Sequence, residues 1–190
     1  MERVSRWRKA LYIVGGLVVV ALVVVSSWVL MNMTLEWTGA APFCTSCHVM
    51  EPMGKAHMEN VHGGNNPYGI HAQCTDCHLP HGNPVKELAT KSWLGIRDVA
   101  VNFFGDPESI DWEARRAHRE EFVYDSACLR CHMTLKEATM GNPRAFLPHR
   151  AYFLGETHVK CVRCHPHVGH TNLGLYLKEA KKEWEEAKAK

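Results

Sequence analysis

The sequence predicts a mainly α-helical chain, with one membrane-spanning helix at the N-terminus and a small second domain built of two similar modules. One observation behind this prediction is an uncharged stretch, rich in Val, Leu and Ile, from Ala10 to Leu35. The other is a set of four short motifs that share one spacing and fall into two close pairs. The chain of 190 residues has room for one small domain plus an appendage, and its net charge of +2 gives no indication of nucleic-acid binding.

The N-terminal stretch has the length and the flanking charges of a membrane anchor. A helix needs about 20 apolar residues to cross a bilayer, whereas the core of a cleavable signal peptide has only about 7–15. Basic residues precede the stretch: Arg3, Arg6, Arg8 and Lys9. Under the positive-inside rule, residues 1–9 are then cytoplasmic, residues 10–35 cross a bacterial inner membrane, and the rest is periplasmic. The small residues Gly39–Ala41 leave cleavage as an alternative.

All eight cysteines belong to Cys-x-x-Cys-His motifs. The motif residues are Cys44, Cys47 and His48; Cys74, Cys77 and His78; Cys128, Cys131 and His132; and Cys161, Cys164 and His165. This motif is the attachment signature of c-type haem, in which the thiols bind covalently and the histidine supplies an axial nitrogen. A zinc tetrathiolate can use two Cys-x-x-Cys pairs but does not require a histidine after each. A disulfide framework of such pairs would brace very little loop. We therefore expect four haems c.

The positions of the motifs indicate two di-haem modules, at about residues 40–82 and 125–172 of a periplasmic domain spanning 36–175. A linking segment, residues 84–120, contains an apolar stripe that predicts a helix over Lys86–Phe104. So small a domain leaves the porphyrins themselves as its core. Loop signals occur at Gly63–Pro67 and Gly141–Pro143, and the charged residues 176–190 predict a solvated helix or a frayed tail without chemistry.

Histidines outside the motifs are the candidates for the distal iron ligands. Two histidines on one iron give a low-potential centre suited to electron transfer, whereas an open distal face permits substrate contact. The candidates are His57, His62, His71, His81, His118, His149, His158, His167 and His170.

Three segments resemble a known family. Phe43–Met50, Cys74–His81 and Gly95–Val99 are similar to the NapC/NirT family of membrane-bound tetrahaem quinol dehydrogenases. The resemblance covers roughly residues 10–172 and is strongest to the NrfH type, the small subunits of cytochrome c nitrite reductase. Gly63–Gln73 and Thr139–Lys160 are longer than in some NrfH-type members.

For the first haem, the resemblance implies that Met50 binds the iron in place of His48. A thioether raises the potential relative to two histidines, although a methionine can also simply pack. The resemblance further implies that Asp98, together with Lys91, lines a quinol site at this haem. The two residues lie about two helical turns apart and so share one face, where an ordinary surface ion pair is the alternative.

For the other haems, the resemblance implies that His170 serves the second iron, His62 the fourth and His149 the third. His118 and His158 are weaker candidates for the third iron, which a lysine of a partner subunit completes in some NrfH-type members. His57, His81 and His167 are expected to form hydrogen bonds to propionates or backbone, and His71 to be exposed.

The implied function is a membrane-bound quinol dehydrogenase that takes electrons from menaquinol or ubiquinol and delivers them to a periplasmic reductase. The large subunit of cytochrome c nitrite reductase is the preferred acceptor, and periplasmic nitrate reductase is the second choice. A passive anchored electron carrier without a quinol site and a terminal reductase in its own right remain as alternatives.

Overall fold

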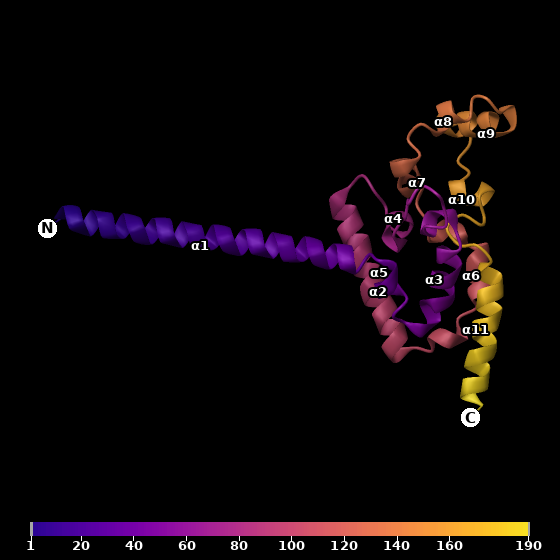
Figure 1. Cartoon of the computed structure of the whole chain (residues 1–190), viewed down its shortest axis with the longest axis horizontal. Coiled ribbons are helices and arrows are strands. Elements are labelled where there is room, and N and C mark those ends of the chain that lie inside the picture. Colours follow the sequence, from indigo (N-terminus) through magenta and orange to yellow (C-terminus); the bar gives the residue numbers. More distant parts are fainter. Residues whose placement is uncertain (1, 190) are drawn as a thin grey trace. The chain divides into compact units, whose positions relative to one another are not determined.

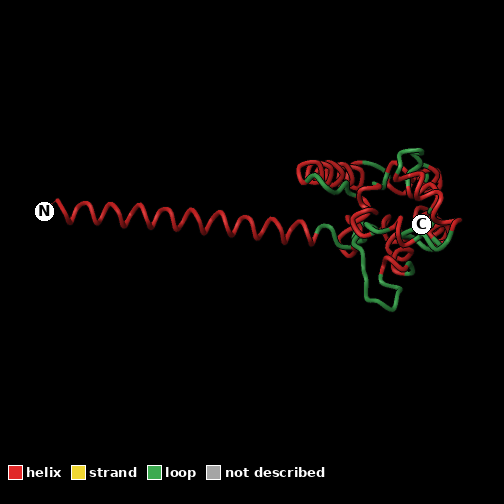
Figure 2. The backbone as a smooth tube through the Cα atoms, turned by 90° about the horizontal axis from the view of Figure 1, so that it is seen from above, coloured by secondary structure: helices red, strands yellow, loops and turns green. Residues whose placement is uncertain are grey.

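The computed structural model describes residues 2–189, with side chains from Arg6 onward. The basic side chain of Arg3 and the final residue Lys190 therefore lie outside the described part of the chain. Every regular element within residues 2–189 is an α-helix or a 3-10 helix, as the colouring of Figure 2 shows. The predicted mainly α-helical fold is confirmed. The chain divides into two compact units, Met1–Gly39 and Ala40–Lys190.

The first unit is a single helix, α1 (Glu2–Trp37) (Figure 1). Among the helices of the described residues, it is the one long and apolar enough to cross a membrane, over Arg6–Trp37. Within the apolar run, the Ser26 hydroxyl donates a hydrogen bond to the Leu22 carbonyl one turn earlier. Such a bond satisfies a polar group that lipid could not satisfy. The helix fits the anchor predicted over residues 10–35 and extends beyond it at both ends.

The second unit consists mostly of short helices joined by loops. Three of its helices are longer, namely the two that connect motifs and the one that ends the chain. The elements, with 3-10 helices written η, are α2 (Ala41–Cys44), η1 (His48–Met50), α3 (Glu51–Met58), η2 (Val61–Gly63), α4 (Cys74–His78), α5 (Pro84–Phe104), η3 (Pro107–Ser109), α6 (Trp112–Ala117), η4 (Arg119–Glu121), α7 (Asp125–Cys131), α8 (Leu135–Ala138), α9 (Pro143–Phe153), α10 (Cys161–Cys164) and α11 (Leu173–Lys188).

Both connecting helices, α5 and α9, begin at an Asn-Pro pair. The Asn83 side chain accepts a hydrogen bond from a backbone N–H in the first turn of α5 at 3.0 Å, and Asn142 does the same for α9 at 3.1 Å. The asparagine satisfies an N–H group that has no partner inside the helix, and a proline such as Pro84 needs none there. The helix predicted over Lys86–Phe104 therefore begins at Pro84, and the loop signal at Gly141–Pro143 contains the start of α9.

The second unit has very little side-chain core. No large side chain of the described residues is fully buried, and most of the buried apolar residues are small. They are Val49, Ala56, Leu79, Ala127, Val162, Leu177 and Ala180. An ordinary domain buries larger aliphatic and aromatic side chains against one another. The helices of this unit are therefore arranged around something other than their own side chains, as a haem-cored domain requires.

The C-terminal helix α11 is docked on the second unit. It packs against α3 and α6, and its residues Leu177 and Ala180 are buried one turn apart. The prediction of a solvated helix or frayed tail over residues 176–190 is wrong for this side of the helix. It holds for the outer side, where ion pairs such as Lys182–Glu186 (3.8 Å) are exposed to solvent.

Candidate haem-binding site

Each Cys-x-x-Cys-His motif is built around one helical turn. Helix α4 contains the whole second motif, and α7 and α10 end at the second cysteine of their motifs, with the histidine directly after. In the first motif, α2 ends at Cys44 and η1 begins at His48. Residues three apart lie on one side of a helical turn, so the two thiols of a motif point the same way.

The thiols place the motifs side by side in chain order. A hydrogen bond from Cys74 lowers the pKa of the Cys44 thiol to about 7 and raises that of Cys74, so the first two motifs touch. In the same way, a hydrogen bond from Cys161 lowers the pKa of Cys128 to about 7. Burial raises the pKa of Cys77 to about 11, with a further contribution from the charge of Cys128. The second motif is therefore next to the third.

Three motif histidines each face a histidine from outside the motifs. The ring centres are 6.2 Å apart in each of the pairs His78–His170, His132–His62 and His165–His149. An imidazole nitrogen binds a transition metal at about 2 Å, and the ring centre lies about 1 Å behind it, so two imidazoles on opposite sides of one metal have centres roughly 6 Å apart. All three pairs fit a single iron between their rings.

Hydrogen bonds from Nδ1 determine which ring nitrogen of these histidines is free to bind a metal. The Nδ1 atoms of His78, His170 and His62 donate hydrogen bonds to the Phe122 carbonyl (2.8 Å), the Met53 carbonyl (3.1 Å) and the Asn60 side-chain oxygen (3.0 Å), respectively. In a neutral ring this leaves the lone pair on Nε2, the usual arrangement around metal-binding histidines.

Burial keeps these rings in the form that binds metal. It is the main cause that lowers the pKa of His78, of His62 and of His170, the last to about 4. A metal binds only the deprotonated imidazole nitrogen, so a ring that is neutral at pH 7 is ready to ligate.

The pairing differs in part from the one that the family resemblance implied. His170 faces the second motif, as expected. His62 faces His132 of the third motif and also lines a cavity with His165 of the fourth, and His149 faces His165 of the fourth motif. Helix η2 brings His62 toward the end of α7, while α9 carries His149 beside α10. Of the weaker candidates, His118 lies 3.5 Å from Glu121.

Two other histidines are committed to hydrogen bonds through both ring nitrogens. His57 is buried between the Gly169 and Ala72 carbonyls, each at 3.0 Å. His81 contacts the Asp76 carbonyl at 3.2 Å and Glu87 at 3.3 Å. For both residues the predicted role in hydrogen bonding is confirmed.

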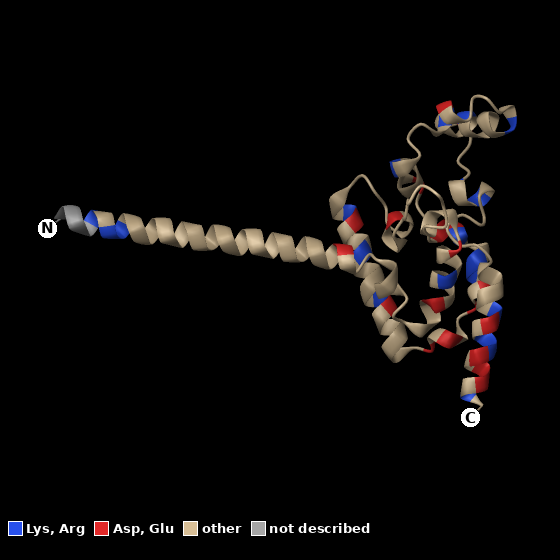
Figure 3. Ribbon diagram, in the orientation of Figure 1, with Lys and Arg blue, Asp and Glu red and all other residues tan. Residues whose placement is uncertain are grey.

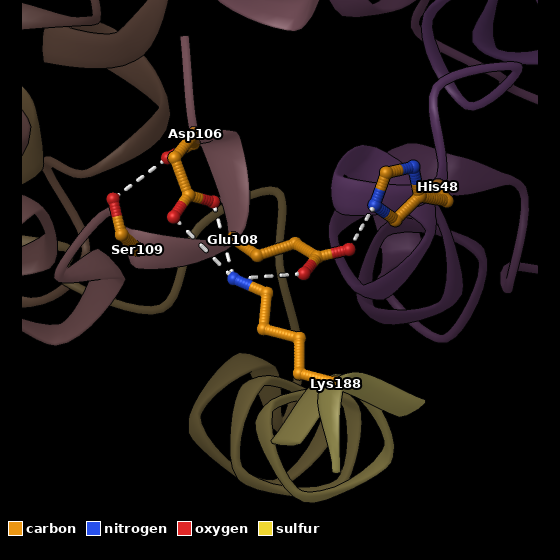
Figure 4. A network of polar contacts seen from close by, with 5 residues as sticks. All are labelled: His48, Asp106, Glu108, Ser109 and Lys188. Atoms are coloured by element: carbon orange, nitrogen blue, oxygen red, sulfur yellow. Dashed lines mark hydrogen bonds and ion pairs between the residues drawn. The ribbon is translucent and has the colours of Figure 1, made fainter. Parts of the chain in front are cut away.

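The first motif is arranged differently from the other three. Nε2 of His48 lies 2.9 Å from Oε1 of Glu108, and Glu108 also contacts Lys188 of α11 (Figure 4). Met50 lies two residues after His48, on the same 3-10 helix. Glu108 and Lys188 were not predicted from the sequence, because they lie far from His48 along the chain and no motif connects the three residues.

The predicted quinol-site residues both lie near the first motif. Lys91 and Asp98 act electrostatically on the Cys44 thiol, and burial lowers the pKa of Lys91. The Asp98 carboxylate accepts hydrogen bonds from Arg97 at 2.7 and 2.9 Å, and its side chain is 64% exposed. Arg97, to which sequence reasoning gave no role, is therefore part of this group.

The opposite face of α5 is apolar and exposed. Trp93, Ile96 and Phe103 are 66%, 67% and 74% exposed, although side chains of this kind are normally covered. A helix with aromatic and aliphatic residues on one face and charged residues on the other is typical of helices that lie on a lipid surface.

Comparison with known proteins decides the family. The NapC/NirT cytochrome c family, N-terminal region, matches residues 6–174. The chain belongs to the NapC/NirT family. The resemblance found in the sequence is thereby confirmed.

Individual NapC/NirT relatives match most of the chain. The cytochrome c nitrite reductase subunit NrfH of Nitratidesulfovibrio vulgaris is 31% identical over 140 residues, which cover 73% of this chain and 72% of the relative. The tetraheme c-type cytochrome CymA of Shewanella oneidensis is 32% identical over 177 residues, covering 85% and 92%. The denitrification system component NirT of Stutzerimonas stutzeri is 29% identical over 171 residues, covering 84% and 82%.

A solved structure of a NapC/NirT relative has the same fold. A chain in the crystal structure of the cytochrome c nitrite reductase NrfHA complex bound to the HQNO inhibitor is 30% identical, with a TM-score of 0.54. The match covers 80% of this chain and 87% of that one. The protein is therefore a c-type cytochrome with an electron-transfer role, and haem is its cofactor. This excludes a zinc-binding structural protein.

A cavity of about 330 Å³ opens beside the fourth motif. Its lining includes the motif residues Cys164 and His165 together with His62 and Val61. Together with the histidine pairs and the missing side-chain core, this cavity shows that the residues present fit the haem groups typical of the NapC/NirT family.

Proposed function

We propose that this chain oxidises a quinol at the membrane surface and passes the electrons, along four covalently attached haems c, to a periplasmic reductase. The observation that carries the proposal is the position of Lys91 and Asp98. Both act electrostatically on Cys44 of the first motif, and they share one face of a helix whose opposite face is apolar and exposed. A quinol ring needs a polar group to take its protons and an apolar surface to leave the bilayer.

The charge distribution supports a cytoplasmic N-terminus. In Figure 3 the ribbon is blue, the colour of Lys and Arg, near the start of α1, and it is tan along the apolar run that follows. Under the positive-inside rule, residues 1–9 stay in the cytoplasm, residues 10–35 cross the inner membrane and the haem domain is periplasmic. Haem attachment to exported cysteines agrees with this orientation.

The residues proposed to hold the haems follow from the motifs and the histidine pairs. The eight motif cysteines attach the porphyrins, and the three histidine pairs ligate the second, third and fourth irons. The contact between His62 and His132 supports the chain's own histidine, in place of a lysine of a partner subunit, as the ligand that completes the third iron. Met50 is the ligand proposed for the first iron. When bound, the haems supply the one-electron chemistry that side chains cannot.

The side chains of α5 are proposed to handle the protons. A quinol releases two protons for the two electrons that it gives up. The Asp98 carboxylate is the group positioned to accept a proton, and Arg97 orients it through two hydrogen bonds. Burial lowers the pKa of Lys91, so more of this side chain is in the neutral amine form, which can accept the second proton.

Cytochrome c nitrite reductase is the preferred acceptor, with menaquinol as the donor. The likeness to NrfH, and to a chain of the NrfHA complex, supports this choice. The chain is equally similar to CymA and NirT, which leaves room for another acceptor, and periplasmic nitrate reductase is the second choice. The proposal of quinol oxidation does not depend on which of them it is.

Replacing Asp98 or Lys91 by alanine should slow quinol oxidation by about 100-fold or more, the usual contribution of a positioned acid–base group. The measurement is the rate at which menaquinol in liposomes reduces the haems of the full-length protein. Lys86→Ala is the matched control, because it removes a charge from the exposed start of the same helix. Dithionite should reduce all variants alike.

Normal rates in both Asp98→Ala and Lys91→Ala would show that the site is wrong. A wild type whose haems menaquinol does not reduce would favour a passive anchored carrier, which exchanges electrons only with soluble proteins. Reduction of nitrite by the isolated chain would instead favour a terminal reductase.

A further inference from the structure

The last turns of α11 reach the first motif. Nζ of Lys188 lies 3.2 Å from Oδ1 of Asp106 and 3.0 Å from Oε2 of Glu108, and both acidic residues belong to the loop and 3-10 helix after α5 (Figure 4). The match to the model of the family's N-terminal region ends at residue 174, near the start of this helix. This contact joins the end of the chain to the segment that follows α5.

Glu108 links Lys188 to the motif histidine. Its Oε1 atom lies 2.9 Å from Nε2 of His48, while its Oε2 atom forms the ion pair with Lys188. Glu108 is 24% exposed, against about half for each of its two partners, His48 at 54% and Lys188 at 52%. An isolated surface pair would contribute little, but one carboxylate with two partners is a small network in a fixed geometry.

The nitrogen held by Glu108 is the one that a metal would need. A carboxylate only accepts hydrogen bonds, so Nε2 of His48 carries the hydrogen and offers no lone pair. The histidine of the second motif shows the opposite arrangement, because Nδ1 of His78 donates to a carbonyl and Nε2 is left for a metal. Trp184, also on α11, holds the His48 ring edge-on, with the ring centres 6.1 Å apart.

Two possible ligands thus lie close together on η1. His48 offers an imidazole and Met50 a thioether, and only the histidine is engaged in a competing contact of this kind. The other three motif histidines each face a second histidine instead. The first motif therefore differs from the other three because its histidine contacts Glu108, which in turn contacts Lys188 of α11.

We infer that Glu108 and Lys188 form a latch that holds Nε2 of His48 away from the first iron and leaves that axial position to Met50. This inference rests on the proposed ligation of the first haem by Met50. The C-terminal helix is then a positioning element for the first haem. A thioether ligand raises the potential of an iron relative to a second imidazole, so the latch keeps this haem a ready acceptor of electrons.

The test compares Glu108→Ala and Lys188→Ala with the wild type in the full-length, haem-loaded protein. Electron paramagnetic resonance and magnetic circular dichroism report whether sulfur or nitrogen binds the first iron, and a redox titration reports its midpoint potential. Losing one charge-assisted hydrogen bond should shift the ratio of thioether to imidazole ligation by about tenfold toward imidazole, and the potential should fall. Lys182→Ala, which removes a charge from the outer side of α11, should match the wild type.

A double variant separates the latch from a general loss of structure. In Glu108→Ala/His48→Ala no imidazole competes, so the thioether signature should return. A full thioether signature in Glu108→Ala and Lys188→Ala would overturn the latch while leaving the proposed function intact, as would a double variant in which the signature does not return. A wild type without any thioether signature, unaltered by Met50→Ala, would overturn the proposed ligation itself and the latch with it.

Discussion

Replacing His170 by alanine should leave the second haem attached but open on one side. The His170 ring faces His78 with its centre 6.2 Å away, and Nδ1 is anchored on the Met53 carbonyl. Without this ring the iron keeps only the motif histidine, so one haem in the chain changes from low spin to high spin and gains the ability to bind carbon monoxide. Electron paramagnetic resonance and carbon monoxide difference spectra measure both changes.

The control for this experiment is His118→Ala, which removes an exposed histidine beside Glu121 and should leave all four haems unchanged. The total haem content of His170→Ala should also equal that of the wild type, because the Cys74 and Cys77 thiols remain. A purely low-spin spectrum without carbon monoxide binding would show that His170 is not an iron ligand.

Removing the fourth motif, with Cys161→Ala and Cys164→Ala together, should stop electron delivery without stopping quinol oxidation. The thiol contacts order the motifs from first to fourth, so the loss of the last one leaves the quinol end complete. The variant should carry one haem fewer by mass. Menaquinol should still reduce the remaining haems, while reduction of a cytochrome c nitrite reductase partner should fall to background.

The mirror variant provides the control. Cys44→Ala with Cys47→Ala removes the first haem, so menaquinol should no longer reduce the chain, yet chemically reduced protein should still pass electrons to the partner. Opposite defects in the two variants would show that electrons enter at the first haem and leave from the fourth. The same defect in both would contradict the order of motifs and would mean that electrons enter and leave at one place.

The features that depend on neighbouring residues could be predicted from the sequence. The Cys-x-x-Cys-His spacing needs only one turn of chain, and the apolar run of α1 needs only its own length. Helix α5 was predictable from its apolar stripe, with an error of two residues at the start. That error has a physical cause, since Pro84 has a low cost in a first turn and Asn83 supplies the cap.

The features that depend on distant parts of the chain could not be predicted in the same way. The identity of the histidine opposite each motif depends on how η2 and α9 are folded back, and this is what places the His62 ring opposite His132 and the His149 ring opposite His165. The same holds for α11. Its charged residues suggest a solvated tail, and only the packed structure brings Lys188 to Glu108.

The most direct test of the account is to embed the full-length protein in liposomes that contain menaquinol and to follow the haem absorbance. A pyridine haemochrome assay on the same sample gives the number of haems per chain. The account predicts four haems per chain and their reduction by menaquinol, with a rate about 100-fold lower in Asp98→Ala. Haems that stay oxidised with menaquinol but are reduced by dithionite would contradict it.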